Sequence, residues 1–240
     1  MDVTHLAQTA AIYALPLLFA ITLHEAAHGY VARHFGDMTA YAQGRVSLNP
    51  LRHIDLIGTL VVPLLLIALS GGKFTFGWAK PVPVNFSALR KPKQHMAWVA
   101  AAGPAVNLAM AAGWALALKL GLEMPVNAFS AALAQMAVAG IVINVVLMVI
   151  NLLPILPLDG GRIVAGVLPR RLSRQYSKAE RWGAPLLTAF IASVPPWLGY
   201  ALADMATGLH WLAFPGRRHS VMANLAVILP RTSRRDRAKI

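Results

Sequence analysis

Residues 18–35 read LFAITLHEAAHGYVARHF, and this stretch decides how the rest of the chain is interpreted. The run is apolar except for a few polar positions, of which His24, Glu25 and His28 stand closest together. Side chains four positions apart share one face of an α-helix, so both imidazoles reach one metal ion. Glu25 stands beside them, where a carboxylate polarises a bound water, as in zinc-binding HExxH helices. A polar cluster that only packs helices together is the alternative, and it explains less because ionisable groups in a bilayer are costly.

The composition places this run in a membrane. Of the 240 residues, 57% are hydrophobic and 13% are charged, whereas soluble chains carry about 25% charged residues. The absence of Cys excludes thiol catalysis and Cys-ligated metals. We therefore expect an all-α polytopic membrane protein with about four to six transmembrane or re-entrant helices.

The net charge of +13 comes mostly from basic residues that are clustered between the apolar runs. Such clusters are typical of cytoplasmic loops beside anionic lipid. A nucleic-acid platform would need interleaved aromatic residues and a soluble scaffold, so we expect a lipid bilayer and no nucleic acid as partner. The clusters are Arg90–Lys93, Arg170–Arg174, Arg217–Arg218 and Arg231–Arg235.

Apolar runs set the expected organisation. They cover about 6–35, 54–70, 96–120, 128–153 and 182–206. We expect a membrane core over 1–206 and a basic, weakly apolar, interfacial segment over 207–240. The run 54–70 is about 25 Å long as a helix, which is short for a ~30 Å hydrocarbon core. Because basic loops flank it on both sides, we expect it to be kinked or re-entrant.

The loop after this run has a different pattern. Phe74, Phe76 and Trp78 alternate with other residues, and Pro81 and Pro83 then favour extended backbone. The pattern predicts a short extended, membrane-associated hairpin over Lys73–Asn85, with an ordinary loop as the alternative.

Zinc needs a third protein ligand besides the two imidazoles. Among the nine acidic residues, three fall where a membrane site can use them: Asp55, Asp159 and Asp204. Asp159 follows the fourth run, where two prolines break the helix and a Gly-Gly pair permits close approach. Irregular backbone at this depth is tolerated where it lines a cavity. We expect Asp159 as the ligand, with Asp55 as runner-up or as a helix cap, and Asp204 third.

These motifs resemble a known family. The segment HEAAH at 24–28, followed by NLLPILPLDG at 151–160, resembles the site-2 protease family of intramembrane zinc metalloproteases. Residues 102–108 (AGPAVNL) resemble the family's G-P-x-x-N segment. The segments 49–55 and 77–84 resemble a compact bacterial subgroup without a PDZ domain. The resemblance covers most of residues 20–165.

The resemblance implies one Zn²⁺ per chain, held by His24, His28 and Asp159. It implies that Glu25 is the general base, which takes a proton from the attacking water and passes it to the leaving amine.

The resemblance also implies roles for two asparagines. Asn151 would position the substrate or its oxyanion, or else hydrogen-bond the broken helix. For Asn107, a hydrogen bond between helices comes first, and support of the site or substrate comes second. Phe74, Phe76 and Trp78 would hold an unwound substrate by strand addition, because a helical peptide bond is shielded from attack.

The implied function is an intramembrane zinc metalloendopeptidase that cuts within or near transmembrane segments. Its substrates would be single-pass membrane proteins or membrane peptides, and its location the bacterial inner membrane. HEAAH also fits a membrane di-iron desaturase or hydroxylase, but the other six His are scattered. A catalytically silent zinc-binding scaffold or a transporter is a further alternative. A silent homologue would be expected to lose Glu25 or Asp159, and a transporter would need more acidic residues.

Overall fold

The computed structural model describes residues 3–62, 64–65, 79–125, 127–183 and 185. Within these residues the chain is helical and contains no β-strand, which agrees with the all-α expectation. The longer helices are α1 (Val3–His34), α4 (Pro92–Glu123) and α5 (Ala128–Asn151). Shorter elements are α2 (Thr39–Ala42), η1 (Pro50–Arg52), η2 (Leu56–Val61), η3 (Phe86–Ala88), α6 (Asp159–Val167), α7 (Arg170–Lys178) and η4 (Ala179–Trp182).

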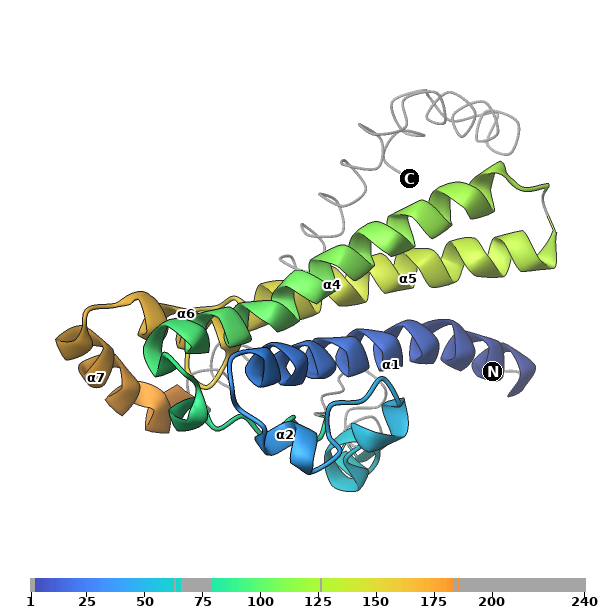
Figure 1. The fold of residues 1–240 in the computed structure, drawn as a ribbon. Helices are drawn as coiled ribbons and strands as arrows, with labels where there is room; N and C mark the ends of the chain where they lie inside the picture. Colours follow the sequence, from blue (N-terminus) through green and yellow to red (C-terminus); the bar gives the residue numbers. More distant parts are fainter. Residues whose placement is uncertain (1–2, 63, 66–78, 126, 184, 186–240) are drawn as a thin grey trace. The chain divides into compact units, whose positions relative to one another are not determined.

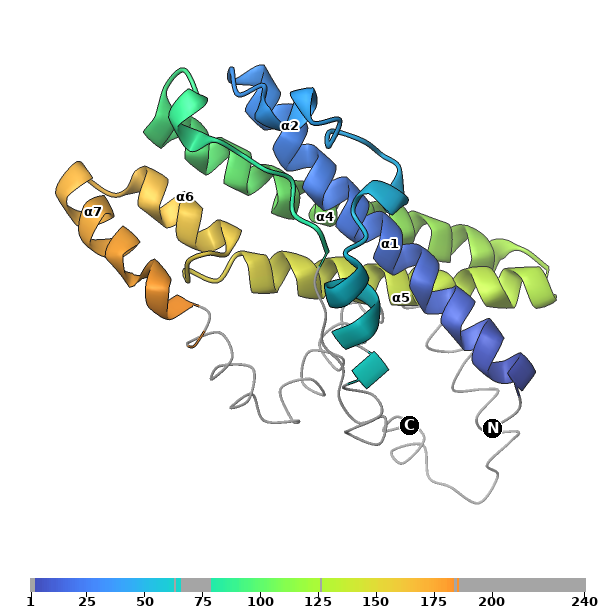
Figure 2. The same cartoon turned by 90° about the horizontal axis from the view of Figure 1, so that it is seen from below.

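Three long helices form the body that carries the site. Figures 1 and 2 show α1, α4 and α5 side by side, with α6 against α4. A short connection joins α4 to α5, so the two run antiparallel. The start of α5 is fixed by a reciprocal cap, in which Asn127 Oδ1 accepts from the Ser130 amide and Ser130 Oγ accepts from the Asn127 amide. This cap satisfies two groups that a helix start leaves free.

The apolar helices are suited to a bilayer. Both α4 and α5 are long and apolar enough to cross a membrane. In the most apolar 18-residue stretch of each helix, only 17% of the residues of α4 and 22% of those of α5 are buried. The core helix of a soluble protein would be mostly buried, so these exposed apolar faces match a lipid environment. The total of four to six membrane helices stays a prediction because residues 66–78 and 186–240 lie outside the described part.

Several expected features fall partly on undescribed residues. In the run 54–70, Asp55 caps the π-helical turn η2 by accepting from the Gly58 amide at 2.6 Å. Residues 63 and 66–70 of that run lie outside the described part, so its path relative to the membrane stays a prediction. Residues 79–85 lack helical structure and pair with no strand among the described residues. Phe74, Phe76 and Trp78, Asp204, and the boundary at 206 also lie outside the description.

The segment 79–85 is fixed to the end of α1 through Asp37. That carboxylate is buried, with 1% exposure. Its two oxygens accept from the Thr39 amide at 2.9 Å and from the Asn85 amide at 2.7 Å. Because a buried carboxylate needs such donors, Asp37 ties the turn after α1 to the segment that leads into α4.

Two glycines bring Asp159 to the body. Helix α5 ends at Asn151, and α6 begins at Asp159 after an irregular link. A Cβ at Gly160 would lie 2.2 Å from the carbonyl oxygen of Leu152, and one at Gly161 would lie 2.6 Å from the Ile155 backbone. Only glycine permits this approach, so the pair folds the first turn of α6 back onto the link, as the sequence indicated.

Candidate metal centre

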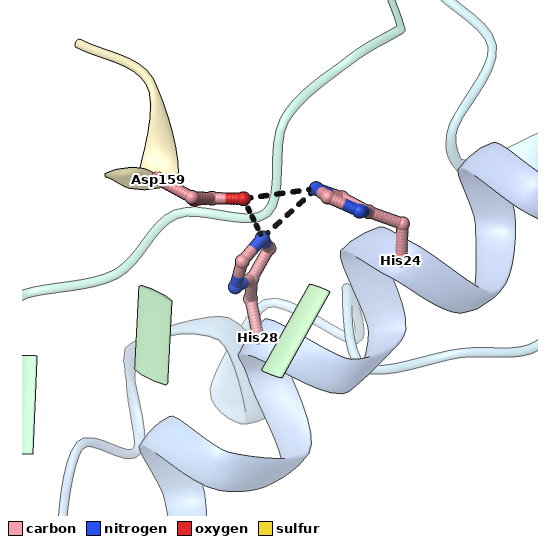
Figure 3. A group of neighbouring side chains, drawn as sticks. All are labelled: His24, His28 and Asp159. Carbon is pink, nitrogen blue, oxygen red and sulfur yellow. Dashed lines mark hydrogen bonds and ion pairs between the residues drawn. The ribbon is translucent and has the colours of Figure 1, made fainter. Parts of the chain in front are cut away.

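Two imidazoles and one carboxylate meet between α1 and the start of α6. Figure 3 shows His24 and His28 on successive turns of α1, with Asp159 facing both. The Nε2 atoms of His24 and His28 lie 3.1 Å apart. Asp159 Oδ2 lies 3.2 Å from His24 Nε2 and 3.3 Å from His28 Nε2. The three atoms therefore form a nearly equilateral triangle, with both His side chains buried.

This triangle fits zinc. Tetrahedral zinc bonds N and O ligands at about 2.0–2.2 Å, which places the ligand atoms about 3.3 Å from one another. The Oδ2 atom of Asp159 is buried and has no hydrogen-bond donor among the described residues. A buried carboxylate oxygen without a donor is costly, and a cation in the triangle compensates it.

The second nitrogen of each imidazole is held from α4. His28 Nδ1 donates to the Val99 carbonyl at 2.7 Å, and His24 Nδ1 donates to Asn107 Oδ1 at 2.5 Å. Because both partners are acceptors, they assign the proton of each neutral ring to Nδ1. Both Nε2 atoms then carry lone pairs that point at the same place, as metal-ligating histidines require.

The contact to Asn107 continues as a relay through three helices. Asn107 Nδ2 donates to Asn144 Oδ1 at 2.9 Å, and Asn144 Nδ2 donates to the Gly140 carbonyl at 2.8 Å. Both asparagines have 0% exposure. The interhelical bond of Asn107 was predicted from the sequence, whereas Asn144 was not among the predicted residues. Asn144 is the single polar side chain within residues 136–150, and this was the available signal.

Gly103 is a second residue whose role the sequence analysis did not assign. A Cβ at this position would lie 2.5–2.6 Å from ring atoms of His24 and from His28 Nε2. No side chain fits there, since real Cβ contacts stay beyond 3.0 Å. Helix α4 therefore supplies a flat floor beneath both imidazoles, and the G-P-x-x-N segment combines this floor with the Asn107 acceptor.

Glu25 lies next to the imidazoles in α1 and is partly exposed. Its Oε2 accepts a hydrogen bond from the Val82 amide at 2.7 Å. Val82 also packs close to Gly29, where a Cβ would lie 3.2 Å from its side chain. The carboxylate is thus oriented by the segment 79–85, which lies against the same helix.

The other predicted site residues occupy different places. Asp55 caps η2 and is not part of the metal-binding group, which resolves its alternatives in favour of the cap. Asn151 Nδ2 donates to the Leu147 carbonyl in its own helix at 3.0 Å. Asn107 faces His24 and not the open surface. Among the described residues, His24, His28 and Asp159 form the single group of three or more potential metal ligands.

Comparisons with known proteins identify the family. The model of peptidase family M50 matches residues 122–194. A Bacillus subtilis protein named "Putative zinc metalloprotease YwhC" is 40% identical over 195 residues, which cover 80% of this chain and 84% of the relative. The chain belongs to peptidase family M50, the site-2 protease family.

Further relatives agree with this assignment. A Mycolicibacterium smegmatis protein named "Putative zinc metalloprotease Rip2" is 33% identical over 168 residues, covering 69% of this chain and 61% of the relative. A Mycobacterium tuberculosis protein of the same name is 32% identical over 205 residues, which cover 83% of this chain and 75% of the relative. No solved structure matches the chain with significance. The protein is a zinc metalloprotease, which removes the di-iron desaturase from consideration.

The protease offers a direct test of the floor at Gly103. Gly103→Ala is expected to push its methyl group into both imidazoles and to weaken zinc binding by at least about 10-fold. Gly113→Ala in the same helix is the control, because a Cβ there meets nothing within 4 Å among the described residues. It should leave zinc binding unchanged and raise stability by up to about 1 kcal/mol. Chelator competition measures the zinc affinity, and equal affinities in the two variants would contradict the packing argument.

The Asn107 relay predicts a graded response. Asn107→Leu removes the acceptor of His24 Nδ1, and zinc affinity should fall about 10- to 100-fold. Asn107→Asp keeps an acceptor at that atom and should retain most of the affinity. A role in helix packing alone predicts the reverse order, because a carboxylate buried between helices is the more disruptive change. Zinc dissociation constants of the three proteins decide between the two roles.

Proposed function

We propose that this zinc metalloprotease is an intramembrane endopeptidase that cuts peptide bonds within or near transmembrane segments of single-pass membrane proteins. One observation carries the proposal: His24, His28 and Asp159 converge on one point beside helices that are apolar, exposed and long enough to span a bilayer. In the proposal these groups lie at the level of the bilayer, where a membrane-embedded segment reaches them.

The basic residues give the proposed orientation. Arg33, Arg90 and Lys93 gather where α1 ends and α4 begins, and Arg90 Nη2 donates to the His34 carbonyl at 2.6 Å. The positive-inside rule assigns this end to the cytoplasm. His28 lies six residues before His34, about 9 Å along the helix. In the proposal, the active site therefore lies toward the cytoplasmic face of a bacterial inner membrane.

In the proposal, His24, His28 and Asp159 hold one zinc ion. When bound, zinc acts as a Lewis acid that makes a water nucleophilic at neutral pH and polarises the scissile carbonyl. Glu25 takes the proton of the attacking water on its carboxylate and delivers it to the leaving amine. The Val82 amide, which donates to Glu25 Oε2, keeps this carboxylate turned in one direction during both transfers.

Asn151 assists the same step in the proposal. It is the last residue of α5 and lies on the chain just before the link to Asp159. Its amide donates one N–H to the Leu147 carbonyl, and no acceptor among the described residues takes the second N–H. We assign this second N–H to the substrate carbonyl, where it stabilises the developing oxyanion.

The substrate is held in extended form by residues 74–84 in the proposal. The described part of this segment is held by hydrogen bonds from a side chain elsewhere in the chain. The Arg45 guanidinium donates to the Lys80 carbonyl at 2.8 Å and to the Pro81 carbonyl at 3.2 Å. These bonds fix the backbone of residues 80–82 beside Glu25, and in the proposal the unwound substrate strand is added along the other residues of the segment. Residues 207–240 are proposed as an interfacial segment outside the catalytic core.

The role of Glu25 is tested by Glu25→Gln. The amide keeps an oxygen for the Val82 N–H but accepts no proton at neutral pH. Cleavage of a model single-pass substrate in vesicles should fall by about 10²- to 10⁴-fold, while about one zinc per chain is retained. Zinc analysis and cleavage are measured on the same preparation. Undiminished cleavage by the variant would exclude Glu25 as the base.

The substrate-binding role is tested separately by Phe76→Ala combined with Trp78→Ala. The double variant should raise KM about 10-fold or more through lost apolar contact, with zinc content unchanged. Tyr13→Ala, an exposed aromatic residue on α1, is the matched control. A fall in kcat at constant KM would place these aromatics outside substrate binding.

A further inference from the structure

A groove lies where the start of α4 meets α6 and α7, away from the metal centre. Its volume is about 1210 Å³, and Lys93, Trp98, Ile163, Val167 and Arg170 are among its lining residues. A second hollow of about 320 Å³ adjoins it, shares Lys93 and Arg170, and adds Arg174. Small-molecule clefts typically occupy about 300–1,000 Å³, so the combined space suits a long, flexible ligand.

The mouth of the groove is strongly cationic. No Asp or Glu lines either hollow, and within the described residues none of Lys93, Arg170 and Arg174 is paired with a carboxylate. The ammonium of Lys93 donates to the Leu168 carbonyl, which holds it at the edge of the groove. Three cations without counter-ions around one hollow favour an anionic group such as a phosphodiester.

The walls of the groove are apolar. Trp98 is 66% exposed and Val167 is 74% exposed, and Ile163 stands beside them on α6. Along α4, Lys93, Ala97 and Ala101 follow one another at four-residue spacing on one face. This face is cationic at Lys93 and apolar at Ala101, about 12 Å further along the helix. A phospholipid has the same order of groups, with a charged headgroup followed by apolar acyl chains.

We propose that this groove binds one anionic phospholipid, with its phosphate at Lys93, Arg170 and Arg174 and an acyl chain along Trp98 and Val167. A free phosphate ion would use the cations and leave the apolar wall exposed. A zwitterionic lipid would bring its own cation to a mouth that has no acidic residue. The site is independent of the proposed cleavage reaction, because none of its residues contacts the metal group.

The test uses the purified full chain in non-ionic detergent, titrated with phosphatidylglycerol and followed by native mass spectrometry. The variant Arg170→Gln with Arg174→Gln should bind this lipid about 30-fold more weakly, because two cations near the phosphate are lost. The control is Arg171→Gln with Lys178→Gln, which removes the same charge from the same helix at positions that line neither hollow. It should change binding by less than about 3-fold.

Two further arms identify the ligand. Trp98→Ala should weaken phosphatidylglycerol binding by about 5- to 10-fold through lost apolar contact. Phosphatidylcholine should bind the wild-type chain no more tightly than it binds the Arg170/Arg174 variant. Equal loss in the two α7 variants would overturn the proposal, because it would reduce the effect to the general charge of the helix. Full displacement by millimolar inorganic phosphate, with normal binding by Trp98→Ala, would overturn it in favour of a simple anion site. Zinc content and far-ultraviolet circular dichroism establish that each variant is folded.

Discussion

The hydrogen bonds on the Nδ1 atoms of His24 and His28 are the interactions on which the site depends. Each ring donates to a fixed acceptor on α4, so each Nε2 offers its lone pair to the same point. Three lone-pair atoms at 3.1–3.3 Å repel one another unless a cation lies between them. The protein can hold them there only because α1, α4 and α6 are fixed relative to one another at this level.

A chain of hydrogen bonds leads from His24 of the metal-binding group into the neighbouring helices. The chain of donors runs from His24 through Asn107 and Asn144 to the Gly140 carbonyl, and it ends on backbone. An amide without partners in an apolar helix would be costly. Here Asn107 accepts from α1 and donates to α5, whereas Asn144 accepts from α4 and donates to a carbonyl of its own helix. The relay therefore sets the tautomer of His24 and the spacing of the helices together.

Glycine determines where helices approach the site. Gly103 leaves room for the imidazoles beneath α4, and Gly160 and Gly161 let α6 turn back onto the link that follows α5. These approaches place a carboxylate from residue 159 against imidazoles from residues 24 and 28. The same body gathers its basic residues at the end formed by α7 and the start of α4. In the proposed orientation, the proposed catalytic groups and the proposed lipid groove both lie toward the cytoplasmic side.

The sequence by itself determined the helical fold class and the zinc chemistry, and its resemblance to a known family determined the proteolytic class. Periodic apolar runs and the His–Glu–His spacing are local signals, and a helix converts them directly into shared faces. Asn107 as a bond between helices was also predictable, since an amide in an apolar run needs a partner. Only the tertiary structure decided which partners are used. It separated Asp159 at the imidazoles from Asp55 at a helix cap, and it introduced Asn144, the floor at Gly103 and the Val82 amide on Glu25. Those contacts join positions as far apart as 24 and 159, and such pairings depend on how helices pack against one another, which no local pattern encodes.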